Sequence, residues 1–285
     1  MTTTIRPAVA ADAAECGRII HDAFAAIADR HNFPRDFPSV EAGIRVATML
    51  IAHPGFYGVI AEQDGKILGS NFIDERSPIA GVGPITVDPA QQNAGVGRRL
   101  MQAVLDRAAA RNLPGVRLLQ DAFHNRSLCL YTSLGFVVRE PVSVMQGQAL
   151  GLNLPGYRVR PASAPDADAC NRLCRRVHGF ERRGDLADAI AGNTATVVEH
   201  QGRITGYATE VAFFGHAVGE TNEDLKALIG AAPAFGGPGF LVPTRNHDLF
   251  SWCLEGGLRL VKQMTLMTLG LYNEPAGAWL PSVLY

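Results

Sequence analysis

The sequence predicts an α+β protein built from two tandem copies of one domain, and three observations support this prediction. The chain has 285 residues, which is close to the length of two ordinary domains. The segment Ile5-Arg-Pro-Ala recurs as Val159-Arg-Pro-Ala, and each copy continues into a helix-like pattern with an acidic residue near its start. Strand-like and helix-like patterns alternate in both halves. We therefore expect domains at residues 1–150 and 156–285, separated by a short breaker-rich segment.

Each half is also expected to contain a β-hairpin, with its tight turn at Asp64-Gly65 in the first copy and at Gln201-Gly202 in the second. Leu100, Val104 and Ala108 fall on one face at helical spacing, which gives the clearest helix prediction in the chain. In order, we expect in the first half a strand at residues 5–6, helices at 12–28 and 40–52, the hairpin, a strand at 83–87, a helix at 97–111, a strand at 116–120, a helix at 127–134 and a strand at 136–138.

Composition excludes several classes of protein. The 26 basic and 27 acidic residues give a net charge of −1 without a long block of one sign, so neither nucleic acid nor an anionic membrane is an expected partner. The start lacks a secretion signal, and the longest uncharged stretch, residues 227–244, contains prolines that a membrane-spanning helix would avoid. Five scattered cysteines fit reduced thiols, and Cys170 and Cys174 lack a second pair of metal ligands. We expect a cytoplasmic protein without a metal; a homodimer is compatible with the sequence but not specified by it.

A glycine-containing loop joins an expected strand to the helix described above. Gly95 and Gly97 let a phosphate approach the backbone, and the unpaired N–H groups of a first helical turn attract anions. Arg98 and Arg99 add positive charge at the same place. A dinucleotide fingerprint would need a small residue where Leu100 stands, and the Gly-Lys-Ser/Thr of a nucleotide P-loop is absent. The loop therefore predicts a pyrophosphate site.

Gln92-Asn93-Ala94-Gly95-Val96-Gly97 resembles the Gln/Arg-x-x-Gly-x-Gly/Ala signature of the GNAT superfamily of N-acetyltransferases. The resemblance covers roughly residues 3–142 and includes the segment from Asn125 to Phe136. It implies two tandem GNAT-like domains, each a mixed, mostly antiparallel twisted sheet flanked by helices, with a degenerate second copy. It also implies acetyl-CoA as the acetyl donor, with the acetyl-pantetheine arm beside the strand that ends at Val87.

The resemblance further implies roles for single residues. The backbone N–H of Val87 would polarise the thioester carbonyl. Tyr131 would be the general acid for the leaving thiolate, a thiol with a pKa near ~8.5, although an aromatic side chain packed on a short helix is the alternative. Asn125 would contact the pantetheine or cap a helix. The residues expected to bind acetyl-CoA are Ile85, Thr86, Val87, Gln92, Asn93, Ala94, Gly95, Val96, Gly97, Arg98, Arg99, Asn125 and Ser127.

The attacking amine must lose a proton, because at pH 7 only about one part in a thousand of an amine with a pKa around ~10 is neutral. Asp74 and Glu75, at the end of the third strand, are candidates for the general base, and so are Asp121 and His124. Each could equally be a solvated loop charge. The base is therefore left unassigned.

The acceptor and the second half are less clearly specified. The loop at residues 28–38 could line an amine pocket or be an ordinary packed loop. In the second half the signature is missing, Glu223 and Asp224 put negative charge at the expected helix start, and Cys253 stands where the first half has Tyr131. We expect this half to bind no CoA and to have a structural or substrate-covering role.

The sequence thus predicts an acetyl-CoA-dependent N-acetyltransferase that moves the acetyl group directly to an amine, with one active site per chain, in the first half. A small-molecule amine or a peptide amine would serve as acceptor. The alternative is a non-catalytic CoA-binding or sensor protein with the same fold.

Overall fold

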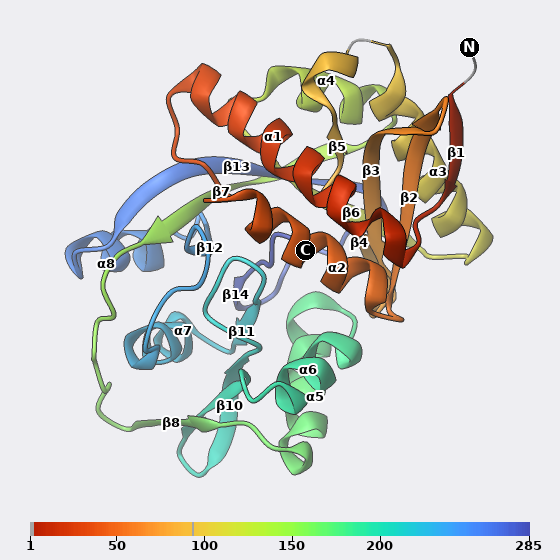
Figure 1. Cartoon of the computed structure of the whole chain (residues 1–285). Helices are drawn as coiled ribbons and strands as arrows, with labels where there is room; N and C mark the ends of the chain where they lie inside the picture. Colours follow the sequence, from red (N-terminus) through yellow and green to blue (C-terminus); the bar gives the residue numbers. More distant parts are fainter. Residues whose placement is uncertain (1–2, 93) are drawn as a thin grey trace.

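The computed structural model describes residues 3–92 and 94–285 (Figure 1). The first half contains β1 (Thr4–Pro7), α1 (Ala13–His31), α2 (Val40–Ala52), β2 (Phe56–Gln63), β3 (Lys66–Asp74), β4 (Ile79–Val82), β5 (Thr86–Val87), α3 (Val96–Ala110), β6 (Gly115–Asp121), α4 (Asn125–Ser133) and β7 (Val137–Gln146). The strand expected at residues 83–87 is confirmed only at Thr86–Val87, which form β5. The preceding strand β4 ends at Val82, and Pro84 between the two strands has no N–H to donate to a ladder.

The second half repeats much of this order. It contains β8 (Tyr157–Pro161), α5 (Ala167–His178), α6 (Arg183–Ala191), β9 (Thr196–His200), β10 (Arg203–Ala208), β11 (Ala217–Gly219), α7 (Asn222–Ala231), β12 (Phe240–Pro243), α8 (His247–Glu255), β13 (Arg259–Gly270) and β14 (Ala278–Leu280). The larger sheet is mixed and mostly antiparallel, and the smaller one is antiparallel throughout. With the flanking helices, they confirm the predicted α+β class.

The same ion pair occurs at the start of both halves. Arg6 binds Asp12 at 2.8 Å, and Arg160 binds Asp166 at 2.8 Å, so that in each copy the first strand is tied to the first helix. The two hairpin turns match as well. Asp64 and Gln201 have φ values of 52° and 51°, and each precedes a glycine with positive φ, as a type I′ turn requires. The repeat recognised in the sequence is therefore a repeat of structure.

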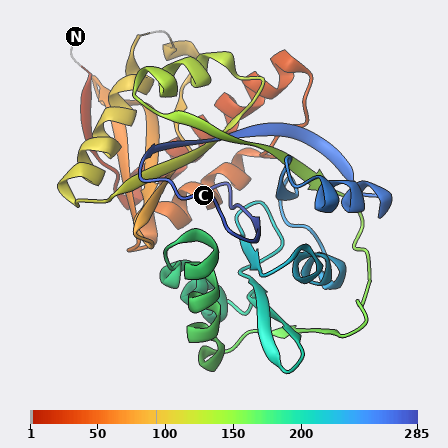
Figure 2. The same ribbon diagram turned by 180° about the vertical axis from the view of Figure 1, so that it is seen from behind.

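The two halves share a sheet, which the sequence did not predict. The larger sheet has the order β1-β2-β3-β4-β6-β13-β7-β12, with β5 paired to β3, and the smaller one has the order β14-β11-β10-β9-β8. Strand β13 of the second half runs between β6 and β7 of the first, and Figure 2 shows its long path from behind. The two sheets therefore do not separate at residues 151–156, because β12 and β13, which follow this segment in the sequence, belong to the sheet of the first half.

Helices cover both faces of the first half's part of this sheet. Ile60 and Phe72 pack with α1 and α2 on one face, whereas Val59 and Ala61 pack with α3 on the other. This division follows from the alternation of side chains along a strand. Within the described residues, no helix is both long enough and apolar enough to cross a membrane.

The strands separate at one point, and this opening positions the site. Strand β4 pairs in parallel with β6 from Ile79↔Gly115 to Gly81↔Arg117. Beyond this point β5 pairs with β3, whereas β6 continues along β13 as far as Asp121. An opening is thus left between β5 and the last residues of β6.

Candidate active site

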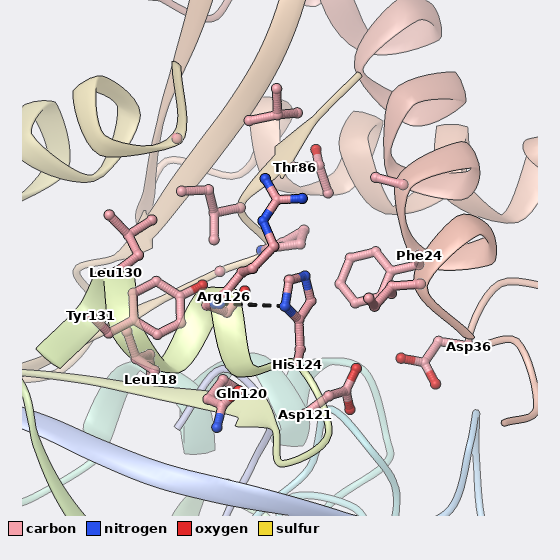
Figure 3. Close-up of a pocket in the computed structure, with 18 of the residues that line it drawn as sticks. Phe24, Asp36, Thr86, Leu118, Gln120, Asp121, His124, Arg126, Leu130 and Tyr131 are labelled. Atoms are coloured by element: carbon pink, nitrogen blue, oxygen red, sulfur yellow. Dashed lines mark hydrogen bonds between the residues drawn. The ribbon is translucent and has the colours of Figure 1, made fainter. Parts of the chain in front are cut away.

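A cavity of about 440 Å³ lies at the separated strands (Figure 3). This volume is in the usual range for small-molecule sites. Residues 85–87, the end of β6, the N-terminus of α3 and one face of α4 line the cavity, together with α1, the loop that follows α1 and several residues of the second half.

The N-terminus of α3 faces this cavity without a side-chain cap. Gly95, in the N-cap position, has a φ of 77°, and the first bond within the helix runs from the Arg99 N–H to the Gly95 carbonyl. The N–H groups of Val96, Gly97 and Arg98 therefore have no acceptor within the helix. A Cβ at position 97 would lie 3.7 Å from the nearest heavy atom of another element, so the turn is not filled by side chains. The arrangement fits a diphosphate.

The backbone N–H of Val87 points into the opening between the strands. Asp88 donates its N–H to the Leu68 carbonyl at 2.8 Å. Residues of an antiparallel pair alternate between facing the partner strand and facing away from it. Val87, one position earlier and opposite Gly69, therefore directs its N–H away from β3, toward β6. A thioester carbonyl lying in the opening could accept this hydrogen bond.

Tyr131 lies on α4, and its side chain lines the cavity near Leu118 and Gln120 (Figure 3). Only 6% of the residue is exposed. Burial raises the pKa of the phenol to about 12, with a smaller contribution from the charge of Asp121, while the Ser127 hydroxyl lowers it. The phenol is consequently protonated at neutral pH and can donate a hydrogen bond.

The other predicted donor-site residues are distributed around this arrangement. Ile85, Thr86, Gln92, Arg98 and Ser127 line the cavity. The Gln92 side chain donates to the Val87 carbonyl at 3.5 Å and accepts from Arg126 at 3.2 Å.

Three predicted residues lie outside the cavity lining, and one lies outside the described residues. Asn125 borders a shallow hollow beside the cavity, together with Arg98 and Cys129. Ala94 and Arg99 are exposed. Asn93 lies outside the described residues.

The positions of Asp74 and Glu75 correct the expectation that either is the base. Asp74 binds Arg76 at 2.6 Å, and this arginine continues to Asp185 of the second half at 2.8 Å. Glu75 binds Arg107 at 2.8 Å. Neither carboxylate lines the cavity, because arginine side chains hold both of them in structural ion pairs. The other two candidates, Asp121 and His124, do line it.

A buried lysine joins two carboxylates at the edge of the cavity. Lys262 of β13 lies within 2.7 Å of both Asp36 and Asp121. Burial would lower the pKa of Lys262, but Asp121 and Asp36 outweigh that effect and raise it. Burial raises the pKa of Asp36, and Lys262 opposes this shift. Asp36 belongs to the loop at residues 28–38 that the sequence offered as a possible lining of an amine pocket, whereas Lys262 was given no role from the sequence.

Residues of the second half form part of the wall of the first half's cavity. Phe213, Met264 and the segment 283–284 line the cavity. In the second half, Thr221 and Asp224 form a capping box at the N-terminus of α7, and β14 pairs along β11 and lies against β12. Within the described part of the chain, no group of three or more His, Cys, Asp or Glu side chains is arranged to hold a metal ion.

The site thus combines an uncapped helix N-terminus with two separated strands of a mixed sheet. Residues 54–138 match the family model described as an acetyltransferase (GNAT) domain. Residues 54–138 of the first half are therefore similar to a GNAT acetyltransferase domain.

Two curated relatives each match slightly less than a third of the chain. A mycothiol acetyltransferase of Thermomonospora curvata is 39% identical over 87 residues, which is 30% of this chain and 29% of that protein. One from Kocuria rhizophila is 37% identical over 89 residues, 29% of each chain. The matches thus span less than a third of either relative.

Solved structures match nearly the whole chain. A Pyrococcus horikoshii protein provisionally assigned to the acetyltransferases has a TM-score of 0.73 at 16% identity, over 97% of this chain and 94% of that one. A GCN5-related N-acetyltransferase from Sphaerobacter thermophilus has a TM-score of 0.62 at 16% identity, over 95% and 96% of the two chains. A tandem GNAT protein from the clavulanic acid biosynthesis pathway has a TM-score of 0.56 at 14% identity, over 99% of this chain and 100% of that one. Both halves together therefore have a tandem GNAT fold.

Proposed function

We propose that this protein is an acetyl-CoA-dependent N-acetyltransferase with one active site per chain, in the cavity between β5 and β6. The observation that carries the proposal is the uncapped N-terminus of α3, which opens onto the same cavity as the Val87 N–H. A diphosphate and a thioester carbonyl are the two groups that the pantetheine arm of an acyl-CoA connects.

The residues present fit this donor. Acetyl-CoA supplies the activated acetyl group as a thioester. The N–H groups of Val96, Gly97 and Arg98 hold the diphosphate, and the helix dipole favours its charge. The Val87 N–H stabilises negative charge on the thioester oxygen as an amine attacks.

Tyr131 acts as the general acid in this proposal. Its phenol lies on the wall of the cavity and is protonated at neutral pH. It donates a proton, or a strong hydrogen bond, to the sulfur that leaves the acetyl carbon. The acid is thus already in place before the acceptor binds.

The second half binds no CoA in this proposal. The first turn of α7 is capped by its own Thr221 and Asp224, and Glu223 adds a further negative charge there. A diphosphate at this place would meet both satisfied N–H groups and repulsion. The paired strand β14 also occupies the place that corresponds to the opening of the first half.

Calorimetry with CoA and thiol detection with a set of primary amines test the proposal. We expect one CoA per chain and acetyl-CoA-dependent thiol release with at least one amine. Two bound CoA molecules would contradict the single site. CoA binding without turnover on any amine would favour the alternative, a non-catalytic CoA-binding or sensor protein.

A further inference from the structure

The end of the cavity away from α3 is mainly apolar and aromatic. Phe24 and Phe37 line it, with ring centroids 5.3 Å apart in an edge-to-face contact. Phe213 and Met264 of the second half complete the wall. Such a surface can receive a hydrocarbon or aromatic group, and it leaves few places at which a polar ligand could form hydrogen bonds.

The charges at this end do not balance. Lys262 is 3% exposed and carries one positive charge between two carboxylates, Asp36 and Asp121. A buried group with one uncompensated negative charge is costly unless a cation or a proton joins it. Arg30 and Arg126 also line the cavity, but both residues are exposed.

The two carboxylates are not equally occupied. Both oxygens of Asp36 accept hydrogen bonds from Lys262 Nζ, each at 2.7 Å. Asp121 contacts this ammonium through Oδ1 at 2.7 Å. Its side chain lies toward the cavity in Figure 3, between those of Gln120 and Asp36. Asp121 is therefore the carboxylate with an oxygen left for a ligand.

Gln120 supplies an independent sign of a ligand. This residue lines the cavity and is only 5% exposed. Among the described residues, neither its amide nitrogen nor its amide oxygen has a hydrogen-bond partner. Buried amides are almost always paired, because leaving one unpaired costs free energy. A bound molecule beside Asp121 would provide the missing partner.

We propose that this end of the cavity binds the acetyl acceptor, that the acceptor is a primary ammonium on an apolar or aromatic body, and that Asp121 is its general base. The inference rests on the proposed function, because it assigns the second substrate of the same site. The ammonium supplies the missing positive charge, and its body lies on Phe24, Phe37 and Phe213.

The proton balance of the transfer follows from these positions. The ammonium gives one proton to Asp121 and becomes a neutral amine. The amine nitrogen bonds to the acetyl carbon as the carbon–sulfur bond breaks. Tyr131 gives its proton to the leaving thiolate, and the second proton lost by nitrogen returns to the Tyr131 phenolate. The products are therefore an amide, CoA thiol, a restored Tyr131 phenol and one proton held by Asp121.

Lys262 is a positioning residue in this scheme. Its Nζ contacts Oδ1 of Asp121 on one side and the carboxylate of Asp36 on the other, and so fixes both carboxylates. Lys262 belongs to β13, the strand of the second half that lies between β6 and β7 of the first. The second half would therefore contribute to catalysis through this strand, although Lys262 itself binds neither substrate.

Paired acceptors test the substrate class. 2-Phenylethylamine and isoamylamine are compared with phenylalanine and leucine, which add a carboxylate beside the same amine. We expect kcat/KM to be at least tenfold higher for the member without the carboxylate, because that group would meet Asp121 and Asp36. Calorimetry in the presence of CoA should show binding of the same amines as ammonium salts.

Asp121→Asn tests the base, with Asp64→Asn in the exposed hairpin turn as the matched control. We expect kcat/KM to fall about 100-fold at pH 7 with the first variant and to stay unchanged with the second. The groups that face Asp121 are Asp36, Lys262, Tyr131 and His124. Without the base, only amine that is already neutral reacts, so the residual rate should rise about tenfold per pH unit between pH 7 and 9.

The outcomes separate this inference from the proposed function. Absence of CoA binding would overturn the proposed function itself. Two results would overturn the acceptor assignment alone, provided that CoA still binds. The first is equal or higher kcat/KM with the carboxylate-bearing amines, and the second is neither binding nor acetylation of any apolar amine. An Asp121→Asn variant with the wild-type pH profile would overturn the role of Asp121 as base.

Discussion

At the scale of single residues, Tyr131 combines burial with a place on the cavity wall. Burial raises its pKa to about 12, so the phenol stays protonated throughout the working pH range. We expect Tyr131→Phe to lower kcat about 100-fold and to leave the affinity for CoA unchanged, because the ring still packs in the same place. Steady-state kinetics and calorimetry measure the two effects.

The size of this loss should not depend on pH between 7 and 9, since the wild-type phenol does not titrate there. Tyr157→Phe, on β8 of the second half, is the matched control and should leave kcat unaffected. If Tyr131→Phe retained full turnover, Tyr131 would be a packing residue only.

At the scale of an element, α3 is the part of the fold that the donor depends on. Its first turn is open because position 97 lacks a side chain. We expect Gly97→Glu to weaken CoA binding at least tenfold, because a carboxylate there would fill the space and repel the diphosphate. Ala109→Glu, exposed near the other end of the same helix, is the control. Calorimetry that gave equal affinities for the two variants would contradict a diphosphate site at this turn.

Local patterns explain which elements the sequence predicted well. The helix expected at residues 97–111 is Val96–Ala110, and the hairpin turns lie at the expected positions, because apolar spacing and turn residues act over a few neighbours. Local patterns offered the loop at residues 28–38 for the acceptor end, but they could not show the buried charge cluster there. Lys262 and Asp36 are 226 positions apart, and only the path of β13 brings them together. Glu75 was misjudged for a related reason, since its partner Arg107 is 32 positions away. For Asp74 the partner Arg76 is only two residues away, and what the local sequence could not show is the contact of Arg76 with Asp185 of the second half.

At the scale of the whole molecule, strand β13 of the second half makes the two halves interdependent, because it lies between two strands of the first half. Strand β13 pairs with β6 over residues 264–270 and with β7 over residues 259–268, so its removal would leave two long edges exposed. We expect residues 1–150 alone to be insoluble or unfolded. A full chain cut at a protease site placed at the exposed Asn153 should instead remain one particle that binds CoA. Size-exclusion chromatography and calorimetry distinguish these outcomes. A soluble 1–150 fragment that bound CoA as tightly as the full chain would show that the first half does not need β13 to fold.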